Sequence, residues 1–185
     1  MAKPLPVIFV GGRAGQWRVD RITAVLGSPL PTTKRIAVYE GTLVAPRGAA
    51  TWVLRGVTSH VRYVQGSEQK ALAAVSPPLG RREATRAALI PIKKSDAWWD
   101  LPQDERRAIF EERSHHIALG LKYLPAIARR LHYSRELAEP FDFLTWFEYA
   151  PEHEAIFDEL VLRLRSTEEW KYVDREVDIR LSRAE

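Results

Sequence analysis

One stretch of the chain, residues 90–129, gathers side chains that could hold an iron porphyrin beside a small oxyanion. The pair Lys93-Lys94 could bind carboxylates such as porphyrin propionates, and the pair Trp98-Trp99 could form a wall against a flat apolar ligand. A nitrogen of His115 or His116 could ligate iron, and the guanidinium of Arg129 could hold an anion opposite it. These residue types together favour redox chemistry on a small anion.

The amino-acid composition narrows the choice of iron ligand. The chain has 185 residues, 45% hydrophobic and 28% charged, which suits one sizeable globular core or two small ones. It has no cysteine, which excludes disulfides, thiolate nucleophiles, cysteine-bound zinc and iron–sulfur clusters. The single methionine is Met1, so a neutral iron ligand must be one of five histidines: His60, His115, His116, His132 or His153.

The charge balance favours a small anion over a nucleic acid. The net charge of +4 and the pI near 9.5 could suit either partner. Basic residues alternate with acidic ones, as in residues 104–107 and 111–113, and no long basic tract carries interleaved aromatics. Apolar runs such as residues 7–10 are far too short to span a bilayer, and residues 1–6 lack the features of a signal peptide. We therefore expect no nucleic acid, no membrane association and a cytoplasmic location.

The hydrophobic pattern predicts interleaved strands and helices. Strands are expected at residues 7–10, 51–57 (continuing through 61–64), 87–92, 141–147 and 170–181, the last with Val173, Val177, Ile179 and Leu181 on one face. Helices are expected at 68–75 with Ser67 as N-cap, 102–112, 116–132 and 151–165, with Pro125 bending or breaking the third. Gly11-Gly12 is expected to turn, and residues 41–50 to form a loop. This order favours an α+β fold with helices packed on antiparallel sheets, and a domain boundary near residues 80–86.

Several of these segments together resemble the chlorite dismutase family. Residues 90–94, followed after three residues by Trp98-Trp99, are similar to its haem-edge segment; residues 120–131 are similar to its haem helix, and residues 142–148 to the strand that follows. The likeness covers about residues 87–175, and the first half matches loosely through residues 54–59 and 62–63. It implies two ferredoxin-like domains, residues 1–83 and 84–185, with haem b in the second. The short chain is similar to the family's short lineage, which implies a homodimer.

The resemblance also implies roles for individual residues. It places the axial iron ligand thirteen residues before a distal arginine, which selects His116 with Arg129 over His115. It implies that Glu169 accepts a hydrogen bond from the axial histidine, although Glu168 could be the matching residue. Without the resemblance, the two histidines would be an ordinary pair on a solvated helix face. A continuous helix would separate the α-carbons of His116 and Arg129 by about 20 Å.

Further residues are expected to line the haem. The resemblance implies that Lys94 contacts the propionates and the network around the axial ligand, and that Ile92 and Trp98 pack against the porphyrin. On residue type alone, Lys94 could equally be a lysine at a strand end, and the tryptophans ordinary core residues. Trp99 could support a subunit interface. Trp146 and Tyr123 are interpreted as core or pocket wall.

The activity that the resemblance implies is chlorite detoxification. Chlorite, a small anionic substrate, would be converted to chloride and dioxygen on haem through a ferryl species and hypochlorite, with Arg129 retaining the hypochlorite. The alternative is a haem peroxidase or a coprohaem decarboxylase on the same fold. The decarboxylases use a tyrosine where this chain has about Arg86, and no tyrosine lies between Tyr63 and Tyr123. A non-catalytic haem-binding protein and, more distantly, a nucleic-acid-binding module also remain open.

Overall fold

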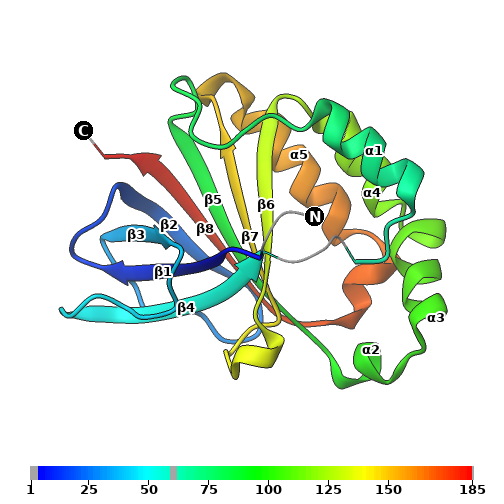
Figure 1. The fold of residues 1–185 in the computed structure, drawn as a ribbon, viewed down its shortest axis with the longest axis horizontal. Coiled ribbons are helices and arrows are strands. Elements are labelled where there is room, and N and C mark those ends of the chain that lie inside the picture. The colour runs from blue at the N-terminus through cyan, green and yellow to red at the C-terminus, as the bar shows by residue number, and fades with distance from the viewer. Residues whose placement is uncertain (1–3, 59–61, 185) are drawn as a thin grey trace.

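Eight strands form a single antiparallel sheet that closes on itself (Figure 1). The computed structural model describes residues 4–58 and 62–184. The order around the sheet is β1-β3-β2-β8-β5-β7-β6-β4, and every neighbouring pair is antiparallel. The strands are β1 (Pro6–Gly12), β2 (Trp17–Leu26), β3 (Arg35–Glu40), β4 (Ala50–Thr58), β5 (Arg86–Lys94), β6 (Ile127–Tyr133), β7 (Phe143–Tyr149) and β8 (Val173–Arg183).

The helices gather on one side of the molecule, beside β5, β6 and β7 (Figure 1). They are α1 (Gly66–Val75), α2 (Asp96–Asp100), α3 (Gln103–Arg107), α4 (His116–Tyr123) and α5 (Glu154–Arg165). A π-helical turn, η1 (Ala108–Arg113), follows α3, and 3-10 turns form η2 (Arg135–Leu137), η3 (Pro151–His153) and η4 (Glu168–Tyr172). The predicted α+β class with an antiparallel sheet is confirmed. None of the helices in the described ranges is long and apolar enough to cross a membrane.

The two halves of the chain repeat one strand order. In the C-terminal half the neighbours are β8-β5-β7-β6, with helices between β5 and β6 and between β7 and β8. In the N-terminal half they are β4-β1-β3-β2, but short loops replace both helices. One of these loops crosses β3 at Gly15, where φ is +145° and an added Cβ would lie 2.3 Å from the carbonyl carbon of Ile36. This crossing therefore requires glycine.

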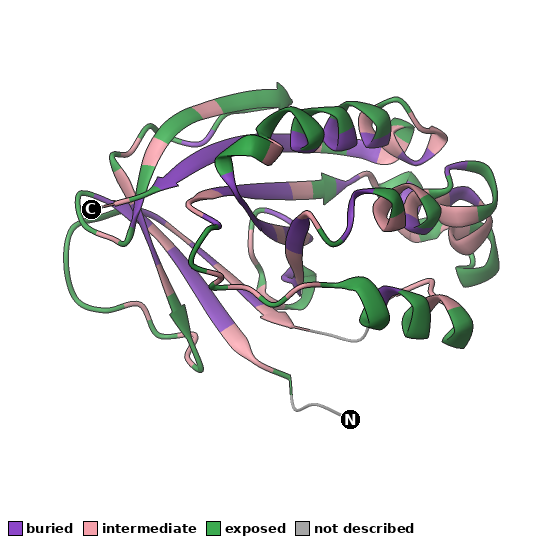
Figure 2. Ribbon diagram, turned by 90° about the horizontal axis from the view of Figure 1, so that it is seen from above, coloured by how far each residue is buried: buried purple, intermediate pink, exposed green. Residues whose placement is uncertain are grey.

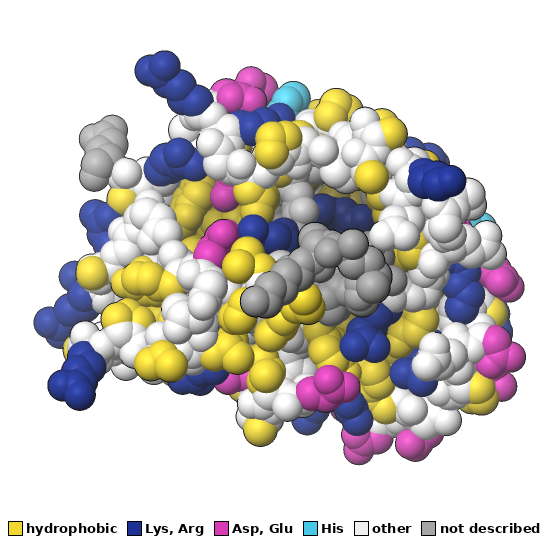
Figure 3. All heavy atoms as spheres, viewed as in Figure 1, with side chains coloured by type: hydrophobic (Ala, Val, Ile, Leu, Met, Phe, Trp, Pro, Cys, Tyr) yellow, Lys and Arg dark blue, Asp and Glu magenta, His cyan; other side chains and the backbone are white. Residues whose placement is uncertain are grey.

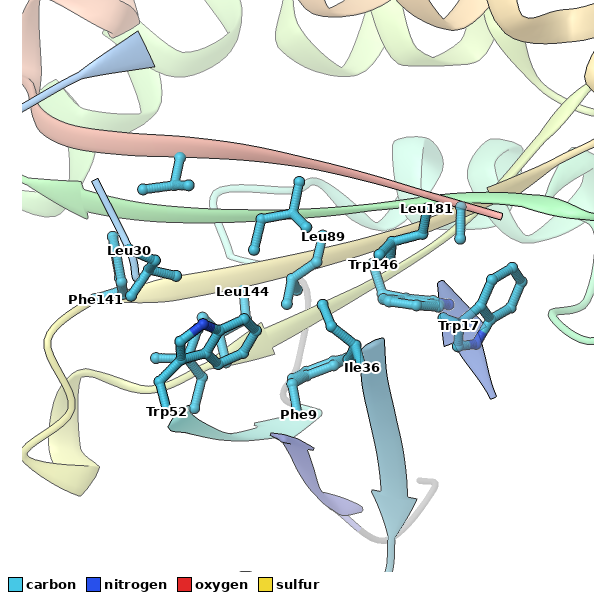
Figure 4. Packing of buried hydrophobic residues seen from close by; sticks show 14 of the residues in the cluster. Phe9, Trp17, Leu30, Ile36, Trp52, Leu89, Phe141, Leu144, Trp146 and Leu181 are labelled. Atoms are coloured by element: carbon cyan, nitrogen blue, oxygen red, sulfur yellow. The ribbon is translucent and has the colours of Figure 1, made fainter. Parts of the chain in front are cut away.

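Side-chain alternation divides the core into two layers. Inside the closed sheet, Trp146 of β7 stacks on Phe9 at 5.6 Å and meets Trp17 edge-on at 5.4 Å (Figure 4). Three residues predicted to share one face of β8 belong to this core, which confirms that part of the alternation: Val177, Ile179 and Leu181. On the outer face, Phe147 and Tyr149 pack against Phe157 of α5. Figure 2 shows the resulting pattern, with several strands buried along much of their length and with helices exposed on their outer sides.

The prediction of one helix over residues 116–132 is wrong beyond Tyr123. Helix α4 ends there, and the chain returns as β6, which pairs with β7 from Ile127 opposite Tyr149 to Tyr133 opposite Phe143. Pro125 explains the break, because proline lacks an N–H and disfavours a helical conformation in the preceding residue. Arg129 therefore lies on a strand, and the helical estimate of its distance from His116 does not apply.

Other boundaries shift by smaller amounts. Gly11 and Gly12 do not turn; they lie in β1 and pair with β3 and β4. Helix α1 has Gln65 as its N-cap, with a capping box to Glu68, instead of Ser67. The strand expected from residue 170 begins at Val173, because residues 168–172 form a 3-10 turn. Residue 61 of the expected strand continuation lies outside the described residues, and residues 62–64 are not in a strand.

Candidate functional site

A largely apolar cavity lies between the outer face of the C-terminal strands and the helices α1, α4 and α5. Its volume is about 1120 Å³ when the open space at its mouth is included, and its lining is mostly hydrophobic, as in cofactor sites. Figure 3 shows that this face is hollowed between the strands and the helices, with hydrophobic and basic side chains around the hollow. Ile90 and Ile92 of β5, Phe147 of β7 and Leu160 and Leu164 of α5 form apolar parts of the wall.

The period of two in a strand selects which side chains reach this cavity. On β5 these are Ile90, Ile92 and Lys94, and on β6 they include Arg129 and Leu131. Strand β7 contributes Phe143, Thr145 and Phe147, whereas its intervening residues Leu144 and Trp146 enter the interior core. The sheet therefore holds a lysine and an arginine at separate places on the same apolar wall.

His116 is the first residue of α4 and contacts a buried carboxylate. Its Nδ1 lies 2.7 Å from Oε2 of Glu169, and its ring stacks on Phe110 with 4.3 Å between centroids. An ionised carboxylate only accepts hydrogen bonds, so Nδ1 carries the hydrogen. In a neutral imidazole, Nε2 then has the free lone pair that can bind a metal. His116 lines the cavity, so a ligating nitrogen is available at its wall.

Glu169 is held in the charged form by the groups around it. Only 4% of the residue is exposed, and its Oε1 lies 2.7 Å from Nζ of Lys94. Burial alone would raise the pKa of Glu169, but the charges and hydrogen bonds of Lys94 and His116 outweigh burial and lower this pKa to about 2. Its neighbour Glu168 instead pairs with Arg113 at 2.9 Å and leaves 34% of its side chain exposed. The structure therefore brings Glu169, and not Glu168, to His116.

Lys94 is enclosed by aromatic rings as well as by its carboxylate partner. Its Nζ lies 4.6 Å from the ring centre of Trp98 and 5.5 Å from that of Trp170. Its backbone N–H donates to Oδ2 of Asp142 at 2.7 Å, beside an irregularity in the pairing of β5 with β8 at Lys93/Lys94. The same carboxylate oxygen accepts from Nε1 of Trp99 at 3.2 Å. Lys94 is thus fixed at both its backbone and its ammonium group.

Arg129 lines the cavity without a charge partner among residues 4–58 and 62–184. Burial lowers the pKa of Arg129, but a guanidinium remains charged at neutral pH. Its neighbour Arg130 contacts Glu40, so the two arginines of this pair are not equivalent. A half-buried cation that has no anionic partner in the described part of the chain is a suitable group to bind a small anion.

The other predicted residues divide between the cavity and the core. Ile92 and Trp98 line the cavity, and the buried Nε1 of Trp98 has no hydrogen-bond partner in the described part of the chain. Trp146 belongs to the interior core, and Tyr123 packs in the cluster under α5. Trp99 binds Asp142, as described above. The cavity therefore brings together His116, Lys94, Glu169, Trp98, Ile92 and Arg129.

Sequence reasoning missed several residues of the wall. Phe110, which stacks on His116, lies in the π-helical turn η1, and no periodic signal in the sequence indicates such a turn. Trp170 was assigned to a strand and lies in the 3-10 turn η4. Thr145 could have been found, because the alternation of residues 143–147 places it on the same face as Phe147.

Comparisons with known proteins identify the family of this chain. The family model described as chlorite dismutase matches residues 35–184, well over half of the chain. The chain belongs to the chlorite dismutase family. A protein of Ideonella dechloratans named chlorite dismutase is 31% identical over 121 residues, which are 64% of this chain and 40% of that protein. The chain thus spans about two fifths of the length of that curated relative.

Two solved structures extend the comparison. A structure of dimeric chlorite dismutases from Nitrobacter winogradskyi is 58% identical, with a TM-score of 0.89, and the match covers 96% of this chain and 99% of that one. A mutant chlorite dismutase from Candidatus Nitrospira defluvii is 20% identical, with a TM-score of 0.67 and 96% and 91% coverage of the two chains. The second likeness concerns the fold alone. The family inferred from residues 87–175 is confirmed.

Proposed function

We propose that this chain is a haem b-dependent chlorite dismutase, which converts chlorite to chloride and dioxygen. One observation carries the proposal: the Lys94–Glu169–His116 network lines the same apolar cavity as the guanidinium of Arg129, which has no charge partner among the described residues. The similarity to proteins named chlorite dismutase, at 58% identity in one case, supports the same activity.

The residues around the cavity fit haem. His116 has a nitrogen free for iron, while Ile92 and other aliphatic side chains offer apolar contacts to a porphyrin. The buried Nε1 of Trp98, which has no hydrogen-bond partner among the residues that the structure describes, could donate to a propionate. Bound haem would supply the iron redox chemistry that rearranges the oxygens of chlorite. We assign His116 as the iron ligand, with Lys94, Trp98, Glu169 and Ile92 as haem-pocket residues.

Glu169 and Lys94 prepare His116 for its role. By accepting the Nδ1 hydrogen, Glu169 fixes both the tautomer and the orientation of the ring, and it increases the basicity of Nε2. Lys94 lies against the other carboxylate oxygen and keeps Glu169 ionised. The two residues therefore make His116 a strong electron donor, which favours oxidised states of a bound iron.

Arg129 provides the anion-binding group. Its charge lies in an apolar, largely desolvated wall, where an ion pair with chlorite is stronger than in water. A planar guanidinium can hold two oxygens at once, so it can orient chlorite and keep reactive oxyanions in the cavity. Arg129 is the catalytic residue of the proposal.

The proposal extends to the domains and the assembly. Residues 1–83 and 84–185 would each be a ferredoxin-like unit, since the two halves share one strand order, and haem would bind in the second unit. A homodimer is supported by the 58% identity to a chain from dimeric chlorite dismutases. Light scattering on the purified protein should give twice the chain mass of 21.2 kDa; a monomer would contradict this part.

One position separates the proposal from coprohaem decarboxylation. Arg86, near the position where the resemblance implies a tyrosine in the decarboxylases, is the first residue of β5 and lies 3.9 Å from Glu154. It is not part of the cavity wall described above, whereas Arg129 is. These observations favour chemistry on a small anion.

Paired variants test the two assignments. His116→Ala should lose the five-coordinate haem spectrum while His115→Ala keeps it; an intact spectrum in His116→Ala would mean that another group ligates iron. Arg129→Ala should still bind haem but release oxygen from chlorite roughly tenfold or more slowly, and should bleach sooner, whereas Arg130→Ala should behave as wild type. Equal rates and lifetimes in both arginine variants would remove Arg129 from the mechanism.

A further inference from the structure

Trp170 is a cavity residue whose position is set by hydrogen bonds at its edge. It follows Glu169 directly in the 3-10 turn η4, and its ring lies 5.5 Å from Nζ of Lys94. Its indole Nε1 donates to Oε2 of Glu176 at 2.8 Å. Because the two residues are adjacent in a tight turn, a rotation of this turn would move both the Trp170 ring and the Glu169 carboxylate.

Glu176 is itself rigidly held. It is 1% exposed on β8, and its Oε1 accepts two N–H groups of Arg165, at 2.9 and 2.6 Å. Arg165 also donates to Asp178 at 2.8 Å. A carboxylate with both oxygens occupied by donors from a helix and from the 3-10 turn offers Trp170 a fixed anchor.

Other bonds also hold the turn η4: the N–H of Trp170 donates to the carbonyl of Thr167 at 3.2 Å, and Glu168 pairs with Arg113. The N–H of Glu169 donates to Oγ of Ser114 at 2.9 Å, and the carbonyl of Tyr172 accepts from the N–H of Ser95 at 2.8 Å. Neither bond fixes the side chains that surround Lys94. The Trp170–Glu176 bond therefore adds a second link between the network around His116 and the sheet, besides Lys94 on β5.

We infer that Trp170, anchored by Glu176, is a positioning residue for the His116–Glu169–Lys94 network. The ring of Trp170 and that of Trp98 both lie against the Lys94 ammonium, which in turn holds Glu169 toward His116. Loss of the indole anchor would let the turn rotate and would weaken the hydrogen bond at Nδ1 of His116. The inference rests on the proposed function only in what it predicts for the reduction potential of bound haem.

The test uses Trp170→Phe, which removes the N–H donor and keeps an aromatic ring. In the haem-free protein, the proton resonance of His116 Nδ1–H should move upfield as its bond to Glu169 weakens. In the haem-loaded protein, the reduction potential should rise, because a less basic imidazole stabilises ferric iron less. Haem affinity should fall by less than the roughly 10-fold to 100-fold typical of groups that bond a metal ligand directly.

Trp52→Phe is the matched control, because Trp52 is also buried and donates one indole hydrogen bond, to the carbonyl of Pro31 at 3.0 Å, far from this network in the interior core. It should leave the resonance and the potential unchanged. Glu176→Gln keeps only one side-chain oxygen, so it cannot accept from Trp170 and from Arg165 through separate oxygens as Glu176 does. It should shift the resonance and the potential in the same directions as Trp170→Phe. If Trp170→Phe does not fold, Glu176→Gln is the test of the inference.

A wild-type resonance and potential in both Trp170→Phe and Glu176→Gln would overturn the inference. A different result would refute the proposed function: a wild-type protein that binds haem through His116 but releases no oxygen from chlorite. The shifts at Nδ1 and in the potential would still decide the role of Trp170.

Discussion

Replacing Glu169 with glutamine should destabilise the haem-free protein more than its small size suggests. The carboxylate contacts both Lys94 and His116 at 2.7 Å, and Lys94 is only 4% exposed. Glutamine is neutral, so it leaves the ammonium of Lys94 buried without a counter-charge. Removing one partner of a buried ion pair costs about 3 to 5 kcal/mol, and the remaining amide oxygen should keep the cost near the lower end.

The lowered pKa of Glu169 gives a similar value for this loss of stability. In the folded protein this pKa is lowered from 4.5 to about 2, and each unit corresponds to about 1.4 kcal/mol, or about 3 kcal/mol in total. Because the folded-state pKa is the lower one, this stabilisation is fully present above pH 4.5 and is lost as the pH falls toward 2. The difference between wild type and Glu169→Gln should therefore shrink in acid.

Urea unfolding of the two proteins at pH 7 and at pH 3.5 measures both effects. The control is Glu168→Gln, since Glu168 forms an exposed pair with Arg113, and it should cost less than about 1 kcal/mol at either pH. Equal losses for Glu168→Gln and Glu169→Gln at pH 7, or a Glu169→Gln loss that does not change with pH, would refute the buried network.

Two further substitutions probe the surroundings of the cavity. Asp142→Ala removes the acceptor of the Lys94 N–H and of Trp99 Nε1, so it should lower the free energy of unfolding by about 2 to 4 kcal/mol. A loss of less than about 0.5 kcal/mol, as for an ordinary surface substitution, would contradict the role of Asp142. His132 is fully buried, and burial lowers its pKa from 6.5 to about 4, so wild-type stability should fall as the pH drops from 6.5 toward 4. In His132→Leu, urea midpoints across this range should fall less steeply, and an unchanged slope would show that His132 does not carry the effect.

Much of the fold could be predicted because its signals are local. Strand-like runs of apolar residues indicated β1, β4 and β5, alternation indicated β7 and most of β8, and helical spacing indicated α5. Strands β2 and β3 gave no such signal; β2 is mostly exposed, and its pairing with β8 depends on residues 150 or more positions away in sequence. Closure of the sheet is likewise a long-range property that local patterns do not encode.

The residues of the candidate site could also be predicted in part, whereas their contacts could not. His116, Lys94 and Arg129 could be proposed from residue type and family spacing, but their contacts depend on the fold. The break at Pro125 places Arg129 on β6, where alternation directs it to the cavity and leaves Arg130 with Glu40. The choice of Glu169 over Glu168 required the 3-10 turn η4, which buries the carboxylate of Glu169 and leaves that of Glu168 partly exposed.

Oxygen release from chlorite tests the proposed activity most directly. The protein would be reconstituted with haem b, supplied with chlorite without any reductant, and followed with an oxygen electrode. The account predicts rapid release of one dioxygen for each chlorite consumed, with chloride as the other product. A protein that binds haem through His116 but releases no oxygen would contradict the proposed function and move it to peroxide or coprohaem chemistry.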